Sequence, residues 1–207
     1  MKRLPLLLPA FLFSSLLWAQ TPTAPDALVK SVAEEVLQTL RTDKSLSGDA
    51  KKAEELVETK ILPHFNFETM TSDTVGKTHW RSASADQKQR LISEFKTLLV
   101  HTYATSLTSY KSQTLRFKPL KLDPADTTAL VKSEVVPPTG QPIQADYLME
   151  KGDNGWKVVD VRFAGISLSA NYRTTFAQEI SNGGIDGLIE YLSGRNKALE
   201  AKRRSAK

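Results

Sequence analysis

Cysteine is absent from this 207-residue chain, and histidine occurs only three times. The lack of cysteine excludes a disulfide framework, thiolate metal sites, cysteine nucleophiles and a lipid-modified N-terminal cysteine. The chain also lacks strong compositional bias, with 28 basic against 23 acidic residues and 8% aromatic residues. This composition excludes disordered, collagen-like and coiled-coil classes. The sequence therefore predicts one ordinary globular domain with a core of its own.

Catalytic motifs are missing as well. The sequence contains no G-x-S-x-G nucleophile elbow, no phosphate-binding P-loop and no G-x-G-x-x-G dinucleotide fingerprint. The side chains that ordinarily titrate near neutrality are His64, His79 and His101, and none lies in a motif. We therefore expect neither catalysis nor a cofactor.

Three weaker features have a functional interpretation and a structural one. His64 and His79 with Asp73 are candidate metal ligands, but their spacing matches no metal-binding pattern, so we interpret them as ordinary loop or surface residues. Asp160, within an apolar strand, is either a catalytic base or, as we expect, a buried carboxylate bonded to backbone or to an arginine. Gly183 and the glycine after it indicate a helix end rather than a phosphate site.

The N-terminus has the features of a secretory signal. Lys2 and Arg3 precede an apolar run that reaches Trp18, which is shorter than the roughly 20 residues of a membrane-spanning helix. We predict a signal peptide over 1–19, cleaved after Ala19, and a polar leader over 20–25, and therefore a periplasmic protein. Leu17 is bulkier than the small residue preferred three positions before a cleavage site, so an uncleaved anchor remains the alternative.

Hydrophobic periodicity then predicts helices, followed by strands, followed by helices again. Helical spacing covers about 26–40, 49–61, 85–110 and 172–192, with a break at 182–184, and strand-like alternation covers 114–120, 128–136, 143–151 and 156–168. The strands follow one another through short turns, which favours antiparallel neighbours. Because strands and helices do not alternate, we predict an α+β fold with a four-stranded antiparallel meander packed against N- and C-terminal helices.

Two blocks of sequence resemble the MlaC family, the toluene-tolerance auxiliary proteins of phospholipid ABC transport systems. The first block contains ILPHFNFE (61–68), VGKTHWR (75–81) and ADQKQR (85–90). The second contains GWKVVDV (155–161), GISL (165–168), NYR (171–173) and GIDGL (184–188). The resemblance covers about 26–195 and leaves a basic C-terminal tail at 196–207.

The resemblance implies an NTF2-like, cone-shaped domain that holds phospholipid acyl chains in an internal apolar cavity. Three residues are assigned to the pocket by this resemblance: Tyr103, Ile143 and Ile166. Alternation of strand faces and the long helix stripe add five more: Leu107, Tyr147, Met149, Val161 and Phe163.

The resemblance also implies the partners. They are phospholipid as cargo, an inner-membrane lipid-transfer ring with its ABC transporter, and an outer-membrane lipoprotein complex. We expect a monomer. Nucleic acid is not an expected partner, because an exported protein does not meet it and two of the 28 basic residues leave with the signal peptide.

Two other functions remain open from the residues themselves. One is a small periplasmic enzyme on a similar scaffold, using Asp160 or a histidine on an apolar substrate. The other is a non-catalytic interaction module of the cell envelope, in which side chains fill the space between sheet and helices. Periodicity does not distinguish a filled core from a cavity.

Overall fold

A computed structural model describes residues 23–46 and 48–205. The predicted signal peptide and most of the predicted leader lie outside the described residues. Among the described residues, no helix has both the length and the apolar character needed to cross a bilayer.

The N-terminal half is helical. Helix α1 (Pro25–Thr42) leads through the 3₁₀ turn η1 (Lys44–Leu46) to α2 (Ala50–Leu56), the π-helical turn η2 (Val57–Ile61) and the 3₁₀ turn η3 (Leu62–His64). Helices α3 (Phe67–Val75), α4 (Lys77–Ser82) and α5 (Ala85–Leu107) follow. Pro25 lies in the first turn of α1, where its missing N–H costs no hydrogen bond. A capping box between Ser84 and Gln87 begins α5.

The sheet is an antiparallel meander in the order β1-β2-β3-β4-β5. Its strands are β1 (Thr114–Phe117), β2 (Thr128–Val136), β3 (Ile143–Gly152), β4 (Gly155–Phe163) and β5 (Ile166–Ser167). The α+β meander is confirmed, but the predicted fourth strand over 156–168 is two strands. The chain turns at Ala164 and Gly165, both at positive φ, and β5 folds back to pair Ile166 with Phe163.

A β-bulge interrupts the alternation of faces in β4. Met149 pairs with Val158 and Leu148 pairs with Asp160, so Val159 is the extra residue between them. Val158 before the bulge and Val161 after it consequently lie on the same face of the sheet. Simple alternation along one regular strand would put these two residues on opposite faces. β4 is buried on both faces, because Val158 and Val159 are 4% and 2% exposed.

Helix α6 (Leu168–Ser205) closes the chain and bends at Gly184, whose φ of 67° and ψ of −163° are not helical. The bend lies at the predicted break. The region predicted as a basic tail continues α6 to Ser205 and packs on the domain: Asn196 is buried and its amide donates to the Glu94 backbone oxygen at 3.0 Å and to the Glu94 side chain at 2.7 Å. Near its end, Arg203 forms an ion pair with Glu54 of α2.

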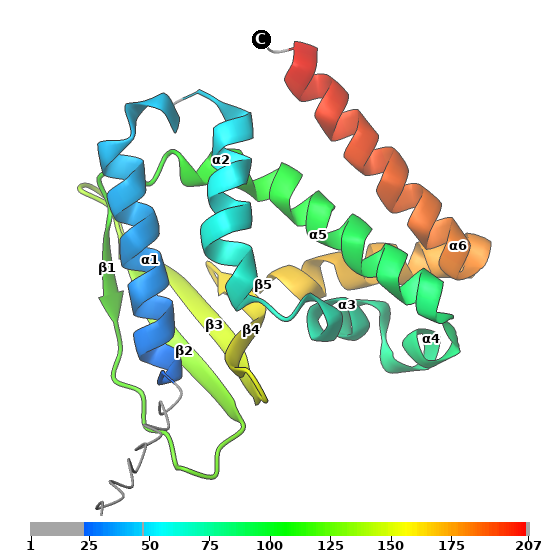
Figure 1. Cartoon of the computed structure of the whole chain (residues 1–207), viewed down its shortest axis with the longest axis horizontal. Helices are drawn as coiled ribbons and strands as arrows, with labels where there is room; N and C mark the ends of the chain where they lie inside the picture. The colour runs from blue at the N-terminus through cyan, green and yellow to red at the C-terminus, as the bar shows by residue number, and fades with distance from the viewer. Residues whose placement is uncertain (1–22, 47, 206–207) are drawn as a thin grey trace, which may run out of the picture.

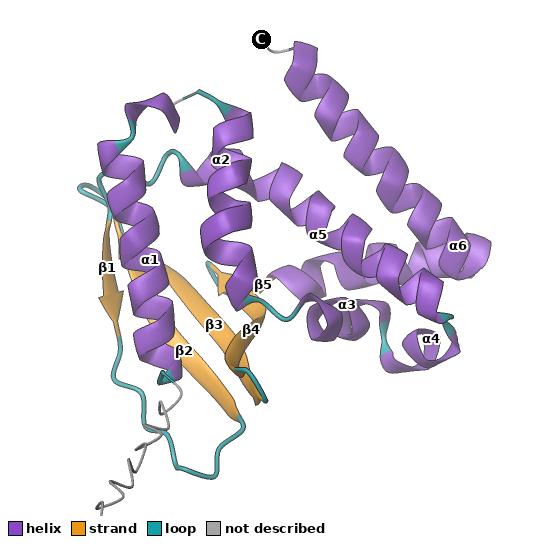
Figure 2. Cartoon of the chain, in the orientation of Figure 1, coloured by secondary structure: helices purple, strands orange, loops and turns teal. Residues whose placement is uncertain are grey.

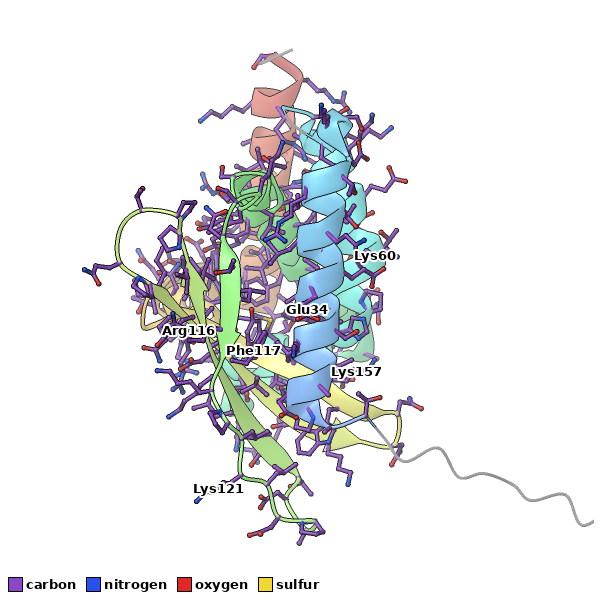
Figure 3. All side chains as sticks on the ribbon, turned by 90° about the vertical axis from the view of Figure 1, so that its left-hand side faces the viewer. Glu34, Lys60, Arg116, Phe117, Lys121 and Lys157 are labelled. Atoms are coloured by element: carbon purple, nitrogen blue, oxygen red, sulfur yellow. The ribbon has the colours of Figure 1, made fainter. Side chains whose placement is uncertain are left out.

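The arrangement has a sheet layer and a helical layer (Figures 1 and 2). α1 runs along one face of the sheet, and Phe117 lies between β1 and α1 when the molecule is viewed from the β1 edge (Figure 3). One core cluster joins α3, α5 and α6 around Phe95, Phe176 and Leu192, and another joins α1 to the sheet around Val131, Met149 and Trp156. The space between these two clusters contains the candidate site.

Candidate functional site: an apolar cavity between sheet and helices

A cavity of about 350 Å³ lies between the sheet and the helices. Its wall takes side chains from almost every element: α1, the turns η2 and η3, α3, α5, the strands β1 to β4 and the start of α6. Representative wall residues are Val32 and Val36 of α1, Ile61 of η2, Leu99 of α5, Met149 of β3 and Val161 of β4. The volume falls in the range of small-molecule pockets.

The cavity wall is almost entirely apolar. Among the described residues, no carboxylate, ammonium or guanidinium group lines it. Its polar atoms come from His64, Ser106, Gln113 and the hydroxyls of three tyrosines, Tyr103, Tyr110 and Tyr147. A wall of this kind suits a hydrocarbon ligand and offers almost nothing to a charged one.

Tyr147 places a hydroxyl on the wall without placing a charge there. Burial is the main cause that raises the pKa of Tyr147, and the nearby Asp146 carboxylate adds to the rise, while a hydrogen bond with the Ser133 side chain opposes it. The Ser133 hydroxyl in turn donates to the Ala145 carbonyl at 2.6 Å. The phenol therefore stays neutral, and its polar atom already has a partner.

Among the wall residues in 23–46 and 48–205, His64 is the one whose charge changes near physiological pH. Burial lowers the pKa of His64, and the ammonium of Lys157 lowers it further, with Glu35 acting in the opposite direction. Lys157 is held nearby because its Nζ donates to the Pro63 carbonyl at 2.6 Å. The imidazole is therefore neutral at pH 7, and the wall carries no net charge there.

Tyr103 of the wall is 36% exposed, so this residue belongs both to the cavity and to the protein surface. Tyr103 hydrogen-bonds with Tyr172 of α6, and burial together with this bond raises the pKa of Tyr172. Tyr110 and Phe163 meet edge to face in the same wall, with ring centroids 6.3 Å apart. Aromatic side chains thus line the wall from the helix α5 side to the strand β4 side.

Six of the eight predicted pocket residues lie on the cavity wall. They are Tyr103, Leu107, Tyr147, Met149, Val161 and Phe163. The structure places the other two, Ile143 and Ile166, outside it. Ile143 is the first residue of β3, and the wall reaches this strand only from Ala145 onward. Ile166 is 62% exposed, because the turn at Ala164 and Gly165 ends β4 before this residue and carries it to the surface. Contact of the eight residues with lipid stays a prediction.

Sequence reasoning missed the contribution of α1 and η2 to the cavity. The wall includes Val32 and Leu37 of α1 and Val57 of η2, whose spacing predicted only the apolar faces of helices. The wide apolar stripe of α1 was the feature of the sequence that could have indicated this contribution.

The remaining candidates are the acid considered as a catalytic base and the three residues considered as metal ligands. Asp160 lies outside the cavity wall, and its Oδ1 accepts the Ser169 backbone N–H at 3.1 Å in the first turn of α6. This is the backbone-bonded carboxylate that we expected. Over residues 23–46 and 48–205, the structure brings together no group of three metal-ligating His, Asp or Glu side chains, so His64, His79 and Asp73 form no such site.

Comparison with known proteins gives a consistent result. The family described as MlaC protein matches residues 30–194. The "Intermembrane phospholipid transport system binding protein MlaC" of Haemophilus influenzae is 26% identical over 186 residues, covering 88% of this chain and 86% of that protein. The "Toluene tolerance protein ttg2D" of Pseudomonas putida is 27% identical over 169 residues, covering 81% of this chain and 77% of the relative.

A solved structure is also similar. It is that of a phospholipid-binding protein from Ralstonia solanacearum in complex with a phospholipid, with 38% sequence identity and a TM-score of 0.78. The alignment covers 84% of this chain and 98% of that one.

Proposed function

We propose that this chain, which belongs to the MlaC protein family, holds the acyl chains of a phospholipid in its apolar cavity and carries the lipid between membranes. It is a phospholipid-binding transport protein. The headgroup, which the cavity wall cannot solvate, stays at the surface near Tyr103.

The apolar cavity is the observation that carries this conclusion. An interaction module would work with its core filled by side chains. A cavity of about 350 Å³ with an uncharged wall instead suits an apolar occupant. The Ralstonia relative with its bound phospholipid supports acyl chains as that occupant.

The energetics fit a passive carrier. Moving one methylene from hydrocarbon into water costs about 0.8 kcal/mol, so exposing a chain of roughly fifteen methylenes costs on the order of 12 kcal/mol. A wall as apolar as the bilayer interior removes most of that cost and leaves the exchange between protein and membrane nearly balanced. Direction must then come from partners, since the sequence contains no P-loop.

The partners belong to this proposal. The name of the Haemophilus relative, an intermembrane phospholipid transport system binding protein, supports exchange with membrane complexes. The resemblance in sequence extends this to an inner-membrane lipid-transfer ring with an ABC transporter and to an outer-membrane lipoprotein complex. A periplasmic location, reached through the signal peptide over 1–19, places the carrier between the two.

A two-chamber transfer assay tests the proposal. Donor vesicles with fluorescent phospholipid and unlabelled acceptor vesicles are separated by a filter that passes a protein of 207 residues but no vesicle. A carrier moves fluorescence into the acceptor chamber in proportion to protein concentration. Transfer no faster than the protein-free rate would refute the carrier function.

A further inference from the structure

A second hollow lies on the outer side of α3 and α4, away from the cavity. Ser72 and Asp73 of α3 and Lys77, Trp80 and Arg81 of α4 line this depression of about 310 Å³. Among the residues that the structure describes, it shares no lining residue with the lipid cavity. The proposed function leaves this hollow unused.

Basic side chains outnumber acidic ones at the depression, whose described lining includes Asp73 together with Lys77 and Arg81. Lys77 and Arg81 are exposed, Lys88 of α5 lies 5.7 Å from the Trp80 ring centroid, and the Arg173 guanidinium reaches the rim by donating to the Asp73 backbone oxygen at 3.3 Å. Within the described part of the chain, none of these four cations forms a salt bridge. Cations elsewhere do: Lys118, for example, pairs with Glu134 at 2.9 Å.

Trp80 gives the depression a rigid apolar centre. Its ring is half-buried and packs against the core cluster of α3, α5 and α6. A tryptophan held in this way is a common centre of binding energy in protein interfaces, because it offers a large area with little loss of side-chain freedom on binding.

α3 separates the two hollows. Phe67 and Met70 of this helix line the lipid cavity, whereas Ser72 and Asp73 line the depression. In Figure 1, α4 lies at the end of the molecule opposite α1 and β1, and α3 lies between α4 and the sheet. A partner bound here would leave the lipid cavity uncovered.

We propose that this depression is a docking site for an acidic segment of a protein partner. Asp or Glu side chains of the segment face Lys77, Arg81 and Arg173, and an aromatic or aliphatic side chain packs on Trp80. The Asp73 carboxylate offers an acceptor for a backbone N–H of the segment. A recessed Trp80 fits an inserted side chain better than it fits a bilayer, which protruding side chains would enter. This inference goes beyond the proposed function and does not depend on it.

The test uses a labelled Glu-Tyr copolymer as the probe and fluorescence anisotropy of its binding to the purified protein. The test variant is Lys77→Glu/Arg81→Glu. The matched control is Lys51→Glu/Lys52→Glu on α2, which changes the net charge equally at exposed positions outside both hollows. All four positions are exposed, so both variants are expected to fold.

We expect the test variant to bind the copolymer about tenfold more weakly and the control variant to bind within about twofold of wild type. Equal weakening in both variants would show an effect of net charge alone and would overturn the proposal. Binding to phosphatidylglycerol vesicles but not to the copolymer, with that binding lost in the test variant, would assign the depression to a lipid surface and would also overturn it.

Discussion

Replacing Val161 by Glu would place a carboxylate on the cavity wall, beside Tyr147 across β3 and β4. In the lipid-free protein, water in the cavity can solvate this group. When an acyl chain enters, the water leaves and the carboxylate must be neutralised. Protonating a glutamate of ordinary pKa, about 4.3, costs about 3.7 kcal/mol at pH 7, at about 1.36 kcal/mol for each pH unit. We therefore expect Val161→Glu to weaken phospholipid binding about 500-fold.

The assay is phospholipid content after extraction, measured with the melting temperature on the same preparations. The loss of phospholipid affinity in Val161→Glu relative to wild type should become about tenfold smaller for each unit by which the pH is lowered toward 4.5. Val161→Gln is the control for polarity, and its deficit should not depend on pH. Ile166→Glu is the control for position, and because Ile166 is exposed and lies outside the wall, it should keep its lipid.

A folded Val161→Glu protein that keeps its full lipid load at pH 7 would refute this reasoning, because the lipid would then not lie against β4. If Val161→Glu does not fold, Leu107→Glu repeats the test from α5 on another side of the cavity. An Ile166→Glu protein that loses its lipid would extend the binding surface onto β5 and contradict a cavity wall that excludes this strand.

Three further predictions concern pH and stability. Because burial lowers the pKa of His64, the unfolded chain binds the proton more readily, so stability should fall as the pH decreases through about 6.5. In thermal melts between pH 7.5 and 5, the melting temperature of His64→Gln should fall less steeply with pH than that of wild type. An equally steep fall would contradict the lowered pKa of His64. Gly184→Ala should destabilise the protein by about 1–3 kcal/mol although its Cβ meets no atom, because the backbone at Gly184 is in a conformation that alanine rarely adopts. Gly183→Ala, at a helical position, should be neutral or stabilising in the same denaturant titrations. Equal effects of the two variants would show that the backbone conformation at Gly184 is not the cause. Asn196→Ala should lower the free energy of unfolding by about 1–3 kcal/mol, because Glu94 loses its hydrogen bonds with Asn196. Lys197→Ala, at an exposed position, should change it by less than about 0.5 kcal/mol. An Asn196→Ala variant as stable as wild type would mean that this part of α6 does not pack against α5.

Hydrophobic periodicity predicted the apolar stripes of α1 and α5 and the antiparallel meander. It did not predict the face of Val158 relative to Val161, because a bulge adds one residue without changing the alternation of residue types. The resemblance to the MlaC family assigned Ile166 to the pocket, and the prediction of a single strand over 156–168 missed the turn at Gly165 that exposes this residue. The pairing that sends Ile166 outward is a long-range property.

The cavity itself could not be predicted from periodicity. An apolar stripe such as that of α1 looks the same whether the opposite wall touches it or stands away from it. The segment 196–207 was predicted to be a basic tail, yet Asn196 within it is buried. Asn196 donates a hydrogen bond to Glu94, which lies more than a hundred residues earlier in the sequence. Only the tertiary structure brings such partners together.

Whether the cavity between sheet and helices holds phospholipid acyl chains can be measured directly on the purified protein. Extraction with organic solvent, followed by mass spectrometry and phosphate analysis, identifies and counts any bound lipid. We expect phospholipid in stoichiometric proportion to the protein, and a loss of that lipid in the Val161→Glu variant. A protein that carries no phospholipid, and takes none up from phospholipid vesicles, would not be the carrier that we propose.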